Sequence, residues 1–160
     1  MAFEANEYGR SVAAPGLVLP DQPYSSVSRC AAEDFESEGG FPVFAIKGED
    51  AKGYAKFPQV PDSSKDDGST KDDPKGYFLG IGQRIVTRDE YPAGTPISVI
   101  VTGMAWVKVG GNVESGDDVA INASGAFVKA DSSVTTLKNV SNAKFMTSAA
   151  NGSYAVVALK

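Results

Sequence analysis

The side chains that could do chemistry in this sequence are carboxylates, serines, lysines and one cysteine, because the chain contains no histidine. Histidine is the most common general base and a frequent metal ligand, so its absence excludes Ser-His-Asp hydrolysis, Cys-His catalysis and histidine-based metal centres. Cys30 alone can form neither an intrachain disulfide nor a cysteine-based zinc site. We therefore expect no catalytic residues, no metal site and no cofactor.

Carboxylate pairs and a serine with a lysine are the remaining catalytic options. A glycosidase needs two carboxyl groups roughly 5 to 9.5 Å apart, but a chain with 20 Asp and Glu residues always offers pairs, and most of them are solvated. No Gly-x-Ser-x-Gly elbow, P-loop or dinucleotide fingerprint is present. A glycosidase or a Ser/Lys peptidase is therefore the weakest functional hypothesis.

Residues 62–76 form a polar stretch, rich in Asp, Lys, Ser and Gly, that invites a calcium interpretation. The EF-hand pattern does not fit this stretch. When the glycine of the pattern is aligned with Gly68, the ligand positions fall on Ser63, Lys65 and Pro74. Lysines among the carboxylates also oppose cation binding. We expect a charged surface loop at 62–76.

The formal charge of -5 argues against nucleic acid as a direct partner, since phosphate neutralisation requires a basic surface. No apolar run approaches the roughly 20 residues that span a bilayer, and the first ten residues do not resemble a signal peptide. The sequence therefore predicts no membrane partner and synthesis in the cytosol of the producing cell.

Any site in this chain must be positioned by strands. The apolar stretches are short and alternate with turn residues, and the chain contains 17 Gly and 9 Pro, a composition typical of strands. We predict an all-β fold with an extended N-terminal arm, 1–38, and a single β domain, 39–160. The arm cannot bury its own apolar residues and would order against another surface, although a locally packed terminus is an equal alternative. The expected strands are 41–46, 54–60, 78–86, 97–102, 104–109, 119–122, 126–129, 144–147 and 153–159.

Two of these strands suggest a binding surface. Alternation places Ala105, Val107 and Val109 on one face, and Met104, Trp106 and Lys108 on the other. Trp106 could anchor an interface or pack beneath a loop of its own subunit. The last strand, 153–159, is apolar on both faces, so a second sheet, a barrel interior or a neighbouring subunit must cover each of them.

The order of motifs from Phe78 to the end, about half of the chain, resembles the structural cement, or decoration, proteins of tailed phages. No single piece is specific, and the colinear order carries the resemblance. The matching pieces are FLGI at 78–81, YPAGTPISV at 91–99, GMAWVKV at 103–109, VESGDDV at 113–119, FMTSA at 145–149 and AVVAL at 155–159.

The resemblance implies a β-barrel-like, β-tulip or sandwich domain, assembled as a homotrimer, on the outer capsid surface of the virion. It implies that the major capsid protein is the partner, that bridging neighbouring capsid subunits stabilises the shell, and that no reaction or cofactor is involved. We expect the arm, Trp106 and the last strand to lie at these contacts. The candidate interface residues are Val12, Leu17, Leu19, Tyr24, Met104, Trp106, Tyr154 and Val156.

The main alternative is a carbohydrate or receptor-binding β module on a virion or cell surface. In that hypothesis Tyr91, Trp106 and Tyr154 form an aromatic platform for a sugar.

Overall fold

The computed structural model describes residues 14–19, 22–46, 48–56, 76–85, 87–131 and 138–160 of the chain. These residues form strands and no helix, so none of them provides a helix able to cross a bilayer. Val12 and all of the predicted loop 62–76 except Gly76 lie outside the described residues. The strands are β1 (Ser25–Ala31), β2 (Phe35–Glu36), β3 (Pro42–Ala45), β4 (Lys52–Gly53), β5 (Tyr77–Gly82), β6 (Glu90–Tyr91), β7 (Pro96–Lys108), β8 (Asp118–Ile121), β9 (Phe127–Lys129), β10 (Lys138–Phe145) and β11 (Tyr154–Leu159).

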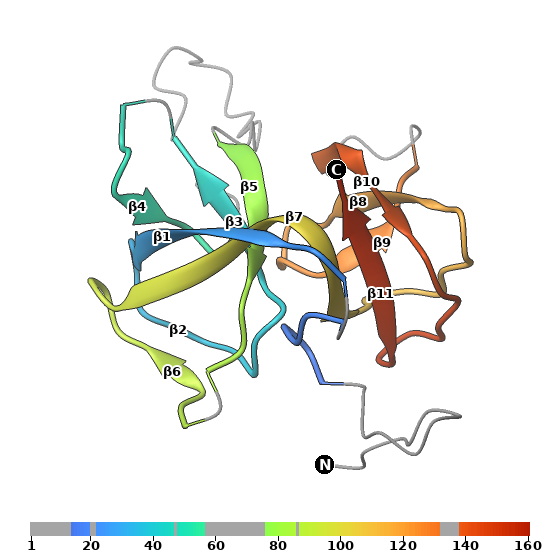
Figure 1. Ribbon diagram of the computed structural model, residues 1–160, viewed down its shortest axis with the longest axis horizontal. Coiled ribbons are helices and arrows are strands. Elements are labelled where there is room, and N and C mark those ends of the chain that lie inside the picture. The colour runs from blue at the N-terminus through green and yellow to red at the C-terminus, as the bar shows by residue number, and fades with distance from the viewer. Residues whose placement is uncertain (1–13, 20–21, 47, 57–75, 86, 132–137) are drawn as a thin grey trace, which may run out of the picture.

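Most strands belong to one strongly curved sheet. Its order is β3-β5-β7-β11-β10-β8-β9, with β1 on β7 and β4 on β1, whereas β2 and β6 form a separate pair. Figure 1 shows two lobes, with β1 to β6 in one and β8 to β11 in the other, and β7 crossing between them. The prediction of an all-β, barrel-like domain is confirmed.

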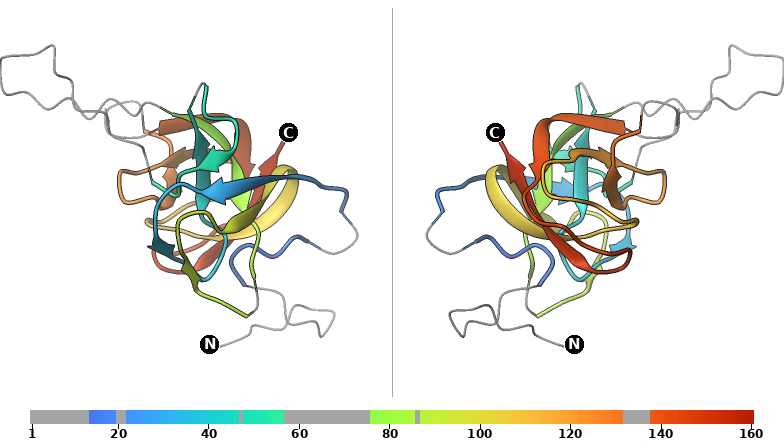
Figure 2. Two further views of the ribbon diagram at one scale, coloured as in Figure 1. Left: turned by 90° about the vertical axis from the view of Figure 1, so that its left-hand side faces the viewer. Right: turned by 90° about the vertical axis from the view of Figure 1, so that its right-hand side faces the viewer.

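The strand β7 joins the two lobes. Its first half pairs with β1 and β5, and its second half pairs with β11. Two strands were predicted here, 97–102 and 104–109, but the chain continues through Gly103, whose φ is +120°. Glycine tolerates this angle, so β7 can change direction there without ending. The two side views show how strongly β7 curves (Figure 2).

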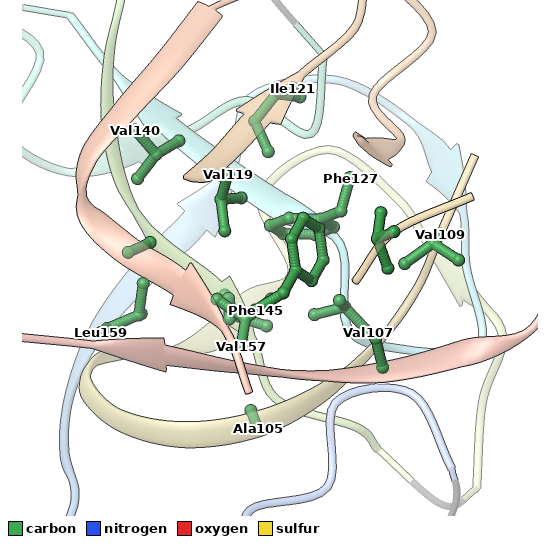
Figure 3. Close-up of a cluster of buried hydrophobic side chains, with 14 of the residues drawn as sticks. Ala105, Val107, Val109, Val119, Ile121, Phe127, Val140, Phe145, Val157 and Leu159 are labelled. Atoms are coloured by element: carbon green, nitrogen blue, oxygen red, sulfur yellow. The ribbon is translucent and has the colours of Figure 1, made fainter. Parts of the chain in front are cut away.

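The larger core fills the space between β7, β11, β10, β8 and β9 (Figure 3). The predicted inward face of β7 is confirmed, because Ala105 and Val107 are 0% exposed and Val109 is 2% exposed. The same cluster continues into the other lobe through Phe44, Ile81 and Ile100. One apolar core therefore links both lobes.

A second core lies under β1, β3 and the β2–β6 pair. It contains Ala31, Phe41, Val43, Tyr91, Ile97 and Val99. The rings of Phe35 and Tyr91 stack with centroids 4.7 Å apart, and Phe41 meets both rings edge-on. This aromatic group fastens β2 and β6 to the main sheet.

The N-terminal part of the chain follows β7 in the antiparallel direction. Val18 forms a bridge with Ala105, and β1 pairs with β7 from Ser25 opposite Thr102 to Cys30 opposite Pro96. The residues from Ala14 onward, with a gap at 20–21, thus pack on their own domain within the range 1–38 expected as an arm. The remainder of that range, 1–13, lies outside the described residues.

A tight backbone junction fixes this segment. The amide of Gly16 donates to the carbonyl of Trp106 at 2.7 Å, and the amide of Arg84 donates to the carbonyl of Gly16 at 3.1 Å. A Cβ atom on Gly16 would lie 2.5 Å from the nitrogen of Gly40, and both glycines have positive φ. Larger residues would not fit here, so the path of the chain between the lobes depends on glycine.

The remaining strand predictions differ from the structure mainly at their ends. β10 begins at Lys138, well before the predicted 144–147, and β1 was not predicted. Of the predicted strand 54–60, residues 57–60 lie outside the described residues. In the part described, Tyr54 forms an isolated bridge with Phe44, and β4 lies just before it at Lys52–Gly53.

Candidate protein-binding surface

The outer face of β7 and β11 is defined by strand register. Val156 lies opposite Trp106, Ala158 opposite Met104, and Tyr154 opposite Lys108. Residues directly opposite in an antiparallel pair share a face. Because Ala105 and Val107 point into the core, these pairs lie on the other side, which we call the outer face.

The segment Gly16 to Leu19 extends this face, because it pairs with β7 through an isolated bridge. The bridge between Val18 and Ala105 places Val18 on the core side, where it packs against the larger cluster. Side chains alternate along a strand, so Leu17 and Leu19 point to the outer face. The amide of Trp106 donates to the carbonyl of Leu17 at 3.0 Å, and that of Leu19 to the carbonyl of Met104 at 3.1 Å.

Met146 extends the face on its other side. The register of β10 with β11 pairs Phe145 with Val157, and the amide of Met146 donates to the carbonyl of Val156 at 2.8 Å. Phe145 is buried in the core, so Met146 points outward. Leu17, Trp106, Val156 and Met146 therefore line up across four neighbouring segments, and we call them the apolar row.

The apolar row is partly open to solvent. Met146 is 45% exposed and Leu17 is 36% exposed, whereas Val156 is only 2% exposed. Trp106 is half-buried, and its indole Nε1 is shielded from solvent with no hydrogen-bond partner among the described residues. An amphipathic ring beside an exposed apolar side chain, here Leu17, is typical of interface anchors.

The structure gathers six of the predicted interface residues on the outer face. These are Leu17, Leu19, Met104, Trp106, Tyr154 and Val156. Val156 is buried, however, and does not contribute to the exposed surface. Tyr24 is 50% exposed and contacts Gly103 beside this face, and Val12 lies outside the described residues. Met146 was missed, although its alternation with Phe145 in the predicted strand 144–147 would have indicated it.

A shallow pocket of about 300 Å³ lies beside the β2–β6 pair in the other lobe. Its lining residues are Asp34, Phe35, Glu36, Glu90, Tyr91 and Pro92. The carboxylate of Asp34 accepts a hydrogen bond from the amide of Ala93 at 2.7 Å, and so it joins the loop before β2 to the turn after β6. Within the described ranges, no three Cys, Asp or Glu residues are grouped in a way that could hold a metal ion.

The aromatic platform of the carbohydrate hypothesis is not formed. Tyr91 is 0% exposed in the second core, and burial raises the pKa of its hydroxyl. Trp106 and Tyr154 lie instead on the outer face of the β7–β11 sheet. The three rings therefore cannot contact one sugar.

The fold and the outer face define an all-β protein with a candidate surface for binding other proteins. The chain belongs to the family of phage structural cement proteins, because the model described as "Structural cement protein (E217 gp24/Pam3 gp6)" matches residues 3–160. The resemblance found in the sequence is thereby confirmed. Family membership makes this chain a structural, capsid-associated protein of a phage virion.

A solved phage capsid structure shares the fold. It is described as "The capsid of Myoviridae Phage XM1", and one of its chains is 19% identical in sequence to this protein, with a TM-score of 0.61. The match covers 99% of this chain and 97% of that one. The head fiber gp8.5 N base of bacteriophage phi29 is 13% identical, with a TM-score of 0.45 over 86% of this chain and 95% of that one. No match was found among curated proteins.

Proposed function

We propose that this protein binds the outer surface of a phage capsid and stabilises the shell by bridging neighbouring major capsid subunits, without catalysing a reaction. The observation that carries the proposal is the apolar row, which places exposed Leu17 and Met146 on either side of half-buried Trp106. Such a row loses its contact with water when it docks on another protein, and this burial favours association.

Stabilisation of the shell follows from linkage. A protein that binds the assembled lattice better than separated capsid subunits shifts the equilibrium toward the assembled form. Repeated weak contacts on one shell also raise the overall avidity. We further propose that the protein acts as a homotrimer and is made in the cytoplasm of the host before it joins the virion.

Co-sedimentation with purified undecorated capsids tests this function. Leu17→Ser and Met146→Ser, combined, should lower capsid affinity at least tenfold while leaving Tm nearly unchanged, because both side chains are exposed. The matched control is Tyr77→Ser, since Tyr77 is 52% exposed but lies on β5 in the other lobe. Saturable binding that the double variant loses and the control retains would support the proposal. Absence of binding by the unmodified protein would contradict it.

A further inference from the structure

The methionines of this chain differ in how far solvent reaches them. Of the three, Met104 and Met146 lie among the described residues, and both belong to the outer face. Met146 is 45% exposed, whereas Met104 is partly buried on β7 opposite Ala158. A dissolved oxidant attacks a thioether most readily where solvent reaches it. Met146 is therefore better placed for oxidation than Met104.

The backbone of Met146 is held by hydrogen bonds on two sides. Its amide donates to the carbonyl of Val156 at 2.8 Å, and its carbonyl accepts a hydrogen bond from the hydroxyl of Ser115 at 3.0 Å. The amide of Val156 in turn donates to the hydroxyl of Thr147 at 2.9 Å. These contacts fix the point from which the side chain projects, and the preceding residue, Phe145, is buried in the core. A chemical change at the thioether of Met146 would therefore alter the surface and leave the fold in place.

We propose that Met146 is an oxidation site of the folded protein, and that its sulfoxide weakens docking of the apolar row on the capsid. The oxidant is a hydroperoxide, for which hydrogen peroxide is the probe. The thioether sulfur attacks one peroxide oxygen, so that an S–O bond forms while the O–O bond breaks, and the displaced hydroxide takes up the proton and leaves as water. Sulfur is oxidised by two electrons and the peroxide is reduced by two. The effect on docking rests on the proposed function.

The sulfoxide changes the chemistry of one end of the apolar row. The thioether of methionine packs as a flexible apolar group, whereas the sulfoxide is polar. Docking must remove water from the sulfoxide, and a polar group buried without a hydrogen-bond partner costs free energy. Leu17, at the opposite end of the row, contains no sulfur and stays apolar. Oxidation of Met146 therefore lowers the affinity of the row for another protein without unfolding the domain.

Peroxide oxidation of the free protein tests the site. The full chain is treated with hydrogen peroxide, and peptide mass spectrometry follows the gain of one oxygen at each methionine. In the folded protein Met146 should react roughly threefold or more faster than Met104, because it is more exposed. In urea the two rates should become similar, since unfolding removes the difference in exposure. Equal rates in the folded protein, or a faster reaction at Met104, would overturn the assignment.

Co-sedimentation with undecorated capsids tests the effect on docking. Met146→Leu and Met104→Leu form a matched pair, because each removes one sulfur and keeps an apolar side chain. Every protein is compared with its own untreated sample, so equal starting affinities are not needed. The oxidised unmodified protein and oxidised Met104→Leu should bind about tenfold more weakly, because the exposed thioether no longer gains free energy on burial, whereas Met146→Leu should not respond. Oxidation at Met1 and Cys30 is common to all three proteins and cannot produce this pattern.

Reversal of the oxidation provides a further check. Methionine sulfoxide reductases convert the sulfoxide back to the thioether, so they should restore the affinity of the oxidised protein. Weaker binding by oxidised Met146→Leu, or unchanged binding by the oxidised unmodified protein, would contradict the role of Met146 in docking. Failure of the untreated protein to bind capsids would remove the proposed function and this role together, but the peptide rates would still decide where oxidation occurs.

Discussion

Tyr24 lies against Gly103 at the point where β7 passes from one lobe to the other. A Cβ atom on Gly103 would be only 2.6 Å from the Cβ of Tyr24, and the φ of Gly103 is +120°. Residues other than glycine rarely adopt this angle. The contact therefore couples the bend of β7 to the start of β1.

Gly103→Ala should lower the free energy of unfolding by about 2 to 4 kcal/mol, because backbone strain and a steric clash act together. Gly94→Ala is a matched variant with φ of +86° but no atom within 4 Å, so it should cost about 1 kcal/mol. Gly111→Ala has neither feature and should be nearly neutral. Urea unfolding of the three variants measures this order, and equal losses would contradict the role of the Tyr24 contact.

Two N-terminal deletions should behave differently. Removing residues 2–13 should lower Tm less than removing residues 2–28, because the shorter deletion keeps every contact among the described residues, which begin at buried Ala14. Removing residues 2–28 also deletes Val18 from the core and most of β1 from its pairing with β7. We expect a loss of several kcal/mol, because large core and hydrogen-bonding losses combine. Thermal unfolding followed by circular dichroism checks this, and equal Tm values for both deletions would contradict the placement of β1.

Asp117 should contribute to stability at neutral pH and lose that contribution in acid. The hydrogen bond from the amide of Glu114, at 2.9 Å, lowers the pKa of the Asp117 carboxyl, and Lys129 at 3.2 Å acts in the same direction. Because the pKa of this carboxyl is lower in the folded state, its ionised form stabilises the fold. This stabilisation is complete at pH values above the unfolded-state pKa of about 4, and it is lost as the pH falls through the folded-state pKa. Asp117→Asn should therefore flatten the fall of unfolding free energy below about pH 4. An unchanged slope would contradict this role.

Both lobes should unfold together because one apolar cluster joins them. Phe145 is 0% exposed, and Phe145→Ala should cost about 3 to 5 kcal/mol. Its chain neighbour Met146 is 45% exposed, so Met146→Ala should change stability by no more than about 0.5 kcal/mol. Trp106 fluorescence and far-ultraviolet circular dichroism should give one common midpoint. Separate midpoints would show that the lobes are independent units.

Sequence periodicity was sufficient to predict the all-β class and the inward face of β7. The alternation of Ala105, Val107 and Val109 with larger or polar neighbours determines which side is buried, because side chains on a strand have a period of two. The family could also be inferred, since the order of turn and strand motifs after Phe78 does not depend on knowing their contacts. The absence of histidine limited the possible chemistry without reference to any structure.

Only the tertiary structure decided which segments of the chain are neighbours in space. β1 reads as Ser-Ser-Val-Ser-Arg-Cys-Ala, with too few apolar residues to signal a strand, and it forms because the edge of β7 supplies its hydrogen-bond partners. The apolar row brings Leu17, Trp106 and Met146 together from segments far apart in the chain. Register between distant strands sets that arrangement, and register depends on packing and backbone pairing across the sheet, which no local pattern encodes.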